Sequence, residues 1–316
     1  MQEWEKPKET YKRKRFGPII AMILLVAAVL VQDGRVPEWI KNKINAGAQN
    51  DTQAEENVFS VHCLDVGQAS ATLIVSGSHA MMIDTGNQDD AEVILDYLEE
   101  QKITTLDYLL LSHPHEDHIG SAATLLRETD VERVLMSDIP LEMCQTATYA
   151  DLLAAIEEKE PVTDYPSAGD TYILGDVTFT VVAPAPHWQH DAENLNESSL
   201  GVLITGGENK VLVYGDGEQA CEQYMVANHD IEADVLVVAH HGSNSGTGNV
   251  LLEAVNPKYA IISCGRDNDY GYPHTEVLER LGQRGIEIYR TDLQGHIFLT
   301  GNGKNISFFN GNFRNP

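Results

Sequence analysis

From residue 58 onward, apolar positions recur in short runs whose length and spacing are typical of β-strands. "VFSVHCLDV" (58–66) alternates apolar and polar positions, which predicts a half-buried strand. "ATLIVSGSHAMMIDTG" (71–86) predicts two strands that turn at Gly77–Ser78. "LDYLLLSH" (106–113) is apolar throughout and predicts a strand buried on both faces. The chain therefore begins its folded part with β structure.

A helix and a second series of strands follow from the same patterns. "DDAEVILDYLEEQ" (89–101) places Ile94, Tyr97 and Leu98 on one helical face after an aspartate cap. Further strands are predicted within 171–184, 199–216, 233–241, 258–265, 287–292 and 295–310. Two β-rich halves with interspersed helices predict an α/β protein in which two sheets pack together with helices outside.

The chain before this domain has a different pattern. An apolar run at 16–31, "FGPIIAMILLVAAVLV", follows the basic stretch "KPKETYKRKR" and predicts one transmembrane helix that acts as a signal anchor. Residues 1–15 would be a basic cytoplasmic tail, 32–57 a polar linker and 58–313 an extracytoplasmic domain at the cell membrane. A cleaved signal peptide, which would give a secreted form, is the alternative.

Charge and cysteine usage restrict the classes of function. The chain has a net charge of −27, and without residues 1–45 the remainder carries 12 basic against 43 acidic side chains. Such a surface repels polyanions, so nucleic acid is disfavoured as a partner and an anionic substrate needs a local positive centre. The four cysteines show no CxxC spacing, which argues against a thiolate zinc site. Cys63 and Cys264 are expected to be buried thiols, with a disulfide as the alternative.

Ligand-type side chains gather where predicted strands end. The candidates are Asp84, His113, His115, Asp117, His118, Asp216, His240 and His241. Imidazole and carboxylate groups are the usual ligands of zinc and similar divalent ions. Within "SHPHEDH" (112–118), His113 and His115 can face one ion, and Asp117 and His118 can face a second. Asp216 can bridge the two.

These motifs resemble a known superfamily. HxHxDH after an apolar strand, with "IDTG" upstream and "GD" downstream, is similar to the metallo-β-lactamase superfamily. More narrowly, "LDVGQ", "SHPHEDHIG", "NESSL", "YGDGE", "HHGSNS" and "YRTDLQGHI" resemble the hydrolase domain of ComEC-type competence proteins, with the phosphorylcholine esterases as cousins. The resemblance covers residues 58–310 and implies an αββα metallo-β-lactamase sandwich with a two-metal site at one edge.

The resemblance also implies roles for individual residues. His113 and His115 would hold the first metal and Asp117 and His118 the second, with Asp216 bridging them. His241 would complete the second site with His240 beside it, although the order of that pair stays open. The candidate catalytic residues are Asp117, His240 and His274. The residues expected to support a ligand or contact substrate are Asp84, Asp65, Gln68, Asn196 and Ser199.

The chain departs from the ComEC-type pattern at two motifs. It has "GQAS" at 67–70 where "GQGD" is usual, and "YGYP" at 270–273 where "YGHP" is usual, so Tyr272 replaces a histidine. The chain shares the Asn-x-x-Ser element of the ComEC-type group, Asn196 to Ser199, where most superfamily members place a further histidine ligand, so the first metal site is expected to be open or weak. The changes at "GQAS" and "YGYP" affect the substrate more than the metal.

The sequence therefore predicts a membrane-anchored, extracytoplasmic hydrolase that uses a metal-activated water on a phosphodiester or related ester. The ComEC-type resemblance implies a phosphodiesterase or nuclease-like enzyme. Two divalent ions are expected, zinc first and manganese as the alternative. The alternative hypotheses are an esterase for phosphocholine or another small ester of the cell surface, and a non-catalytic metal-binding module. The expected partners are the membrane and a phosphoester substrate, with no obligate protein partner.

Overall fold

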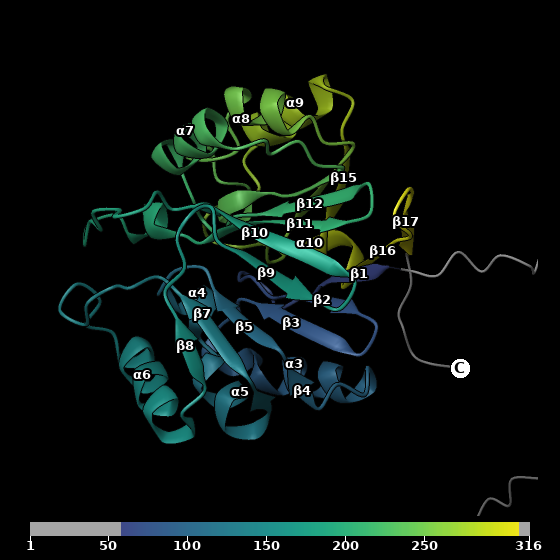
Figure 1. The fold of residues 1–316 in the computed structure, drawn as a ribbon. Helices are drawn as coiled ribbons and strands as arrows, with labels where there is room; N and C mark the ends of the chain where they lie inside the picture. The colour runs from purple at the N-terminus through teal and green to yellow at the C-terminus, as the bar shows by residue number, and fades with distance from the viewer. Residues whose placement is uncertain (1–57, 310–316) are drawn as a thin grey trace, which may run out of the picture. The chain divides into compact units, whose positions relative to one another are not determined.

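Residues 58–309 are described by the structure, a computed structural model. The predicted cytoplasmic tail, transmembrane helix and linker at 1–57 lie outside the described residues. Within 58–309, no helix is both long and apolar enough to cross a membrane. Two sheets face each other and helices cover their outer faces (Figure 1), which confirms the predicted αββα sandwich.

The first sheet has eight strands in the spatial order β17, β16, β1, β2, β3, β5, β7 and β8. Their bounds are β1 (Phe59–Cys63), β2 (Thr72–Ser76), β3 (His79–Ile83), β5 (Tyr108–Leu111), β7 (Arg133–Met136), β8 (Val162–Asp164), β16 (Ile297–Gly301) and β17 (Ile306–Phe309). The hairpin between β2 and β3 turns at Gly77, whose φ of 61° suits glycine. The closing hairpin of the chain crosses back to pair β16 with β1, a placement that the sequence patterns do not predict.

The second sheet has seven strands in the spatial order β15, β14, β13, β12, β11, β10 and β9. Their bounds are β9 (Thr171–Leu174), β10 (Val177–Ala183), β11 (Gly201–Gly206), β12 (Asn209–Val213), β13 (Val235–Val237), β14 (Tyr259–Ile262) and β15 (Glu287–Arg290). The two predicted hairpins, β9–β10 and β11–β12, both form. A separate two-stranded sheet joins β4 (Thr105–Leu106) to β6 (Asp130–Val131).

Helices cover each sheet on its outer face (Figure 1). Those beside the first sheet are α3 (Ala91–Glu100), α4 (Glu116–Ile119), α5 (Ala122–Glu128) and α6 (Ala147–Lys159). Those beside the second are α7 (Gln219–Asn228), α8 (Asn249–Val255) and α9 (Thr275–Gln283), while α10 (Thr291–Gln294) follows β15. Short 3₁₀ helices are η1 (Gln88–Asp90), η2 (Leu195–Ser198) and η3 (Ala239–Gly242). As predicted, α3 buries Ile94, Tyr97 and Leu98.

Three apolar layers hold these elements together. The middle layer lies between the sheets and includes Val61 from the first sheet and Val202 from the second. The outer layers join each sheet to its helices, for example through Leu152 of α6 and Met225 of α7. All four cysteines are buried free thiols, so the predicted thiols are confirmed and the disulfide alternative is wrong.

Strand direction decides where polar side chains can gather. β3 and β5 run parallel in the first sheet, and β12, β13 and β14 run parallel in the second. Loops at the carboxyl ends of parallel strands meet at one edge of a sheet, where ligands commonly bind. The loops after β5, β12 and β13 carry all the predicted metal ligands, and the loop after β3 carries Asp84.

Candidate metal centre

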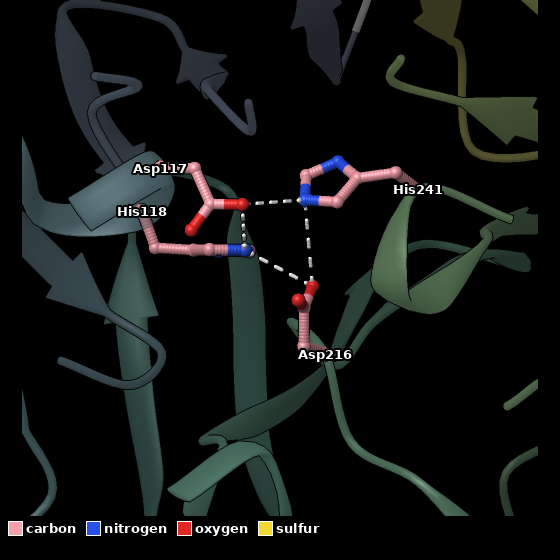
Figure 2. A group of neighbouring side chains, drawn as sticks. All are labelled: Asp117, His118, Asp216 and His241. Carbon is pink, nitrogen blue, oxygen red and sulfur yellow. Dashed lines mark hydrogen bonds and ion pairs between the residues drawn. The ribbon is translucent and has the colours of Figure 1, made fainter. Parts of the chain in front are cut away.

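Four ligand-type side chains from both halves of the sandwich converge on one point. Asp117 and His118 lie on α4, in the loop region after β5. Asp216 follows β12, and His241 lies in η3 after β13. Figure 2 shows the two carboxylates and two imidazoles pointing toward one another from these separate elements. One ligand atom from each lies within 4.8 Å of those of the other three.

The spacing of these atoms suits a single divalent ion. His118 Nε2 lies 3.0 Å from a carboxylate oxygen of Asp216 and 4.0 Å from one of Asp117. His241 Nε2 lies 3.2 Å from a carboxylate oxygen of Asp117 and 3.8 Å from one of Asp216. Zinc bonds of about 2.0–2.2 Å place tetrahedral ligands about 3.3 Å apart. His118 Nε2 and Asp216 Oδ1 are both buried and, although they lie 3.0 Å from each other, form no hydrogen bond, which costs free energy unless a ligand satisfies them. The donor set therefore fits a divalent cation.

Asp84 fixes the orientation of His118. Its Oδ2 accepts hydrogen bonds from His118 Nδ1 at 2.7 Å and from the Ser112 hydroxyl at 2.8 Å, and its Oδ1 accepts one from the Ser112 backbone N–H at 2.7 Å. With Nδ1 donating to the carboxylate, the Nε2 lone pair of His118 faces the cluster. The sequence resemblance implied this role for Asp84. It did not indicate Ser112, because serine is not a residue type that sequence patterns associate with metal sites.

His241 is oriented by the neighbouring strand. Its Nδ1 lies 2.9 Å from the carbonyl oxygen of Ser263 at the end of β14, so Nδ1–H donates and Nε2 faces the cluster. The backbone reaches this position through φ values of 52° at His240, 54° at His241 and 84° at Gly242. Such left-handed residues are strained when they are not glycine and are typical of functional sites. Of the tandem pair, His241 is the one that joins the four-residue cluster.

Burial and mutual charge set the pKa values in the cluster. Burial lowers the pKa of His118, but Asp216, Asp84 and Asp117 together hold it well above its ordinary value. Burial raises the pKa of Asp216, but His118 and His241 hold it well below its ordinary value. A cation that binds these groups therefore competes with protons for them.

A second group of histidines surrounds the other oxygen of Asp216. His113 Nε2 lies 4.0 Å and His240 Nε2 lies 3.7 Å from Asp216 Oδ2. His115 Nδ1 lies 3.0 Å from His113 Nε2, and burial lowers the pKa values of both His113 and His115. Asp216 thus has one carboxylate oxygen toward each group, and its role as a bridge between two ions stays a prediction.

Neighbouring polar residues support these two groups. The Ser199 hydroxyl accepts a hydrogen bond from the Asp216 backbone N–H at 3.2 Å, and the Asn196 amide nitrogen lies 3.5 Å from His240 Nδ1. The same His240 nitrogen lies 2.9 Å from the Ser245 hydroxyl and 3.4 Å from a Glu218 carboxylate oxygen. Ser245 and Glu218 were missed, because only the folded loops bring them to His240.

Three further predicted site residues make hydrogen bonds that hold loops in place. Asp65 caps its own turn and donates its backbone N–H to His296 Nδ1 at 2.8 Å, and Gln68 Oε1 accepts the Gly265 backbone N–H at 3.0 Å. His274 Nδ1 accepts the Asn244 backbone N–H at 3.0 Å, so this histidine joins two loops. The structure places none of the three in the four-residue cluster, and their roles toward substrate stay predictions.

Comparison with known proteins agrees with this fold and donor set. The sequence profile of the metallo-beta-lactamase superfamily matches residues 64–266, which include every residue of the four-residue cluster. The chain belongs to the metallo-beta-lactamase superfamily. Its donor set of two carboxylates and two imidazoles points to divalent metal binding, without identifying the metal.

Curated relatives of the chain include a ComE operon protein and Competence protein ComA of Neisseria gonorrhoeae, which confirms the ComEC-type resemblance. ComE operon protein 3 of Bacillus subtilis is 33% identical over 258 residues, which cover 75% of this chain and 32% of that protein. Recombination protein 2 of Haemophilus influenzae is 33% identical over 253 residues, which cover 78% of this chain and 29% of that protein. The chain therefore spans about a third of the length of these relatives.

Solved structures share the fold at low sequence identity. A metallo hydrolase from the archaeon Ignicoccus hospitalis matches with a TM-score of 0.50 at 15% identity, covering 76% of this chain and 98% of its own. CmlA, a diiron beta-hydroxylase from Streptomyces venezuelae, matches with a TM-score of 0.51 at 14% identity, covering 78% and 54%. This fold occurs in both a metallo hydrolase and a diiron beta-hydroxylase. The fold therefore does not identify the reaction, which must be argued from the residues of the site.

Proposed function

We propose that this chain is a metal-dependent hydrolase of phosphodiester or related ester bonds. The observation that carries the proposal is the convergence of Asp117, His118, Asp216 and His241, with buried Nε2 and carboxylate atoms left facing one another. Divalent ions at such a site polarise a phosphoryl or carbonyl group and make water acidic enough to supply the nucleophile near neutral pH. Zinc is the first candidate for a donor set rich in imidazole, and manganese is the alternative.

The protein's own residues supply orientation and proton transfer. Asp84 and the Ser263 carbonyl hold the Nδ1 protons of His118 and His241, so both Nε2 atoms stay available as ligands. The side chain of His240 is 19% exposed, whereas that of His241 is 3% exposed. With its Nδ1 beside Ser245, His240 keeps Nε2 directed at the site and is the proposed proton donor to the leaving group.

The charge of the chain supports a small or locally bound anionic substrate. Outside residues 1–45 the net charge is −31, so a phosphoester is attracted only where cations are held. Ions in the cluster would provide that local positive centre. The resemblance to the ComEC-type hydrolase domain favours a phosphodiester, and the acidic surface favours a short one over a long polynucleotide.

The sequence also supports a membrane-anchored protein whose hydrolase domain lies outside the cytoplasm. The apolar run at 16–31 with its basic flank is the basis for a single-pass anchor with the hydrolase domain on the extracytoplasmic side. Protease added to intact cells should then degrade the domain. Full protection of the domain in intact cells, with digestion only after lysis, would contradict this orientation.

Hydrolysis of bis-p-nitrophenyl phosphate tests the catalytic proposal. The full chain is stripped with chelator and assayed before and after addition of zinc or manganese, together with Asp216→Ala and His118→Ala. We expect metal-restored turnover in the wild type and a loss of at least about a hundredfold in both variants, because each removes a ligand to the ion. A Lys159→Ala variant, changed at the far end of α6, is the matched control and should keep its turnover.

The outcomes distinguish three hypotheses about the function of the site. Metal-restored turnover that both variants lose supports the hydrolase. Turnover that the two variants keep contradicts the assigned site. Stoichiometric metal binding without turnover of any phosphoester or carboxylic ester would make the chain a metal-binding module and overturn the proposal.

A further inference from the structure

A series of aromatic rings leads outward from the metal centre to the surface. The ring of Tyr272 lies nearly parallel to that of His241, with centroids 6.4 Å apart and an interplanar angle of 20°, and 5.6 Å from the ring of His240. Tyr270 stacks on Tyr272 at 5.4 Å and 15°. Tyr270 is 66% exposed, so the outer end of the series faces solvent.

The loop that carries both tyrosines is held in place by its own hydrogen bonds. The Asn268 side chain donates to the carbonyls of Gly265 and Tyr272 at 2.9 and 2.7 Å and accepts the Tyr272 backbone N–H at 2.9 Å. The Gly271 N–H also donates to the Asn268 carbonyl. The rings are therefore presented without a large ordering cost when a ligand binds.

The loop is also fastened to the turn that carries His241. The His274 backbone N–H donates to the Gly242 carbonyl at 2.9 Å, and a Cβ at Gly242 would lie 2.5 Å from Pro273 Cβ. This close approach keeps Tyr272 beside the tandem histidines. The position of the aromatic series relative to the metal centre is thus part of the fold.

We propose that Tyr270 and Tyr272 form a stacking subsite for a nucleobase of the substrate. The subsite rests on the proposed function and deepens it, because it assigns recognition of a base in the substrate to two named residues. Parallel rings with one exposed end offer a flat surface to a planar ring, whereas a quaternary ammonium group is usually held in a cage of convergent aromatic faces. Stacking uses no positive charge, which suits a surface as acidic as this one.

One exposed ring accommodates one base. Asp267 and Asp269 lie within the loop on either side of Asn268 and are exposed, so they repel the phosphates of a long strand. Arg266, the nearest cation in sequence, donates through Nε and one Nη to the Asp292 carbonyl. The subsite therefore favours a nucleotide ester or a strand end over continuous polynucleotide binding.

Three chromogenic esters with the same leaving group test the subsite. Thymidine 5′-(p-nitrophenyl phosphate) carries a base, p-nitrophenyl phosphorylcholine carries a cation, and methyl p-nitrophenyl phosphate carries neither. In the full chain, Tyr270→Ala should lower the ratio of kcat/KM for the thymidine ester over the methyl ester about tenfold. Tyr270→Phe should keep the ratio, and so should Phe309→Ala, which removes an exposed ring from β17.

Other patterns overturn the subsite. An unchanged ratio in Tyr270→Ala would mean that the base does not stack there. A fall for the phosphorylcholine ester but not the thymidine ester would make the rings a cation site. Equal losses for all three esters would assign the rings to the shared leaving group.

Equilibrium binding separates failure of the subsite from failure of the hydrolase. 2-Aminopurine riboside 5′-monophosphate loses fluorescence when its base stacks, so the metal-loaded chain should quench it, and Tyr270→Ala should weaken binding about tenfold. Quenching that is equal in both contradicts the subsite. Quenching that depends on Tyr270 in a chain that hydrolyses none of the esters would keep the subsite and contradict the proposed function.

Discussion

The Asp84 carboxylate accepts a hydrogen bond from His118 Nδ1 at 2.7 Å and thereby aims Nε2 at the metal centre. Carboxylates in this position commonly contribute 10- to 100-fold to metal affinity. Asp84→Asn should therefore weaken zinc binding by about 10- to 100-fold, as measured by competition with a chromogenic chelator.

The chain contains a matched control for this variant. Asp107 accepts a hydrogen bond from His79 Nδ1 at 2.6 Å, and His79 begins the strand that Asp84 follows. Asp107→Asn removes the same kind of pair away from the metal centre and should leave zinc affinity unchanged. Equal affinities for Asp84→Asn and wild type would show that His118 keeps its orientation without the carboxylate.

Gly215 lets the two halves of the site approach closely. It has a φ of +52°, and a Cβ there would lie 2.6 Å from both Cβ and Oγ of Ser112. Gly215→Ala should lower the free energy of unfolding by about 3 kcal/mol, through backbone strain and overpacking. Gly282→Ala is the control, because its Cβ meets nothing within 4 Å on α9, and it should raise stability by about 0.5–1 kcal/mol. Urea unfolding measures both, and a Gly215→Ala loss below 1 kcal/mol would contradict the close approach.

Glu222 fastens the loop after His241 to α7. Its buried carboxylate accepts the Tyr214 hydroxyl at 3.0 Å and the backbone N–H groups of Thr247 and Gly248. Glu222→Ala leaves these donors without an acceptor and should lower the free energy of unfolding by about 3 kcal/mol. Glu253→Ala, at an exposed position on α8, should change it by less than about 0.5 kcal/mol. Similar unfolding midpoints for the two variants would mean that water replaces the Glu222 carboxylate.

His62 should make stability depend on pH. Burial, with a smaller contribution from His296, lowers its pKa from 6.5 to about 4. Its ring nitrogens contact the hydroxyls of Ser60 and Tyr97, each at 2.7 Å. Because the unfolded chain binds the proton more tightly, the stabilisation is complete above pH 6.5 and is lost as the pH falls toward 4, by about 3 kcal/mol in total.

The His62→Gln variant isolates this contribution from other titrating groups. Its free energy of unfolding should fall less than that of the wild type between pH 6.5 and 4, by a margin of about 3 kcal/mol. Urea titrations at several pH values measure the difference. Parallel pH profiles for the two proteins would show that His62 does not carry the dependence.

Local sequence patterns predicted the individual helices and strands better than they predicted which strands pair with each other. The β2–β3 hairpin and the buried face of α3 follow from a glycine turn and from the spacing of Ile94, Tyr97 and Leu98. The pairing of β16 with β1 joins segments more than two hundred residues apart, and no local pattern encodes it. Strand partners depend on which apolar faces fit together in the whole fold.

The same division holds at the site. The HxHxDH motif pointed to Asp117 and His118, because carboxylate and imidazole side chains are recognisable in a sequence as metal-ligand types. The sequence could not choose between His240 and His241, because the choice depends on left-handed backbone angles and on the carbonyl of Ser263. Gln68 lies inside a family motif, but only the structure shows that its side chain holds a loop by accepting the Gly265 N–H, and its role toward substrate stays a prediction.

The origin of the four ligands has a mechanical consequence. Asp117 and His118 come from the α4 region of the first half, while Asp216 and His241 come from the second half, about a hundred residues later in the chain. An ion held by all four would cross-link two halves that, apart from the chain segment connecting them, are joined by non-covalent packing. Loops of this length gain much from closure, and metal binding energy is then also folding energy. The supply of metal in its surroundings would thereby set how long the protein survives proteolysis, as well as whether it can act.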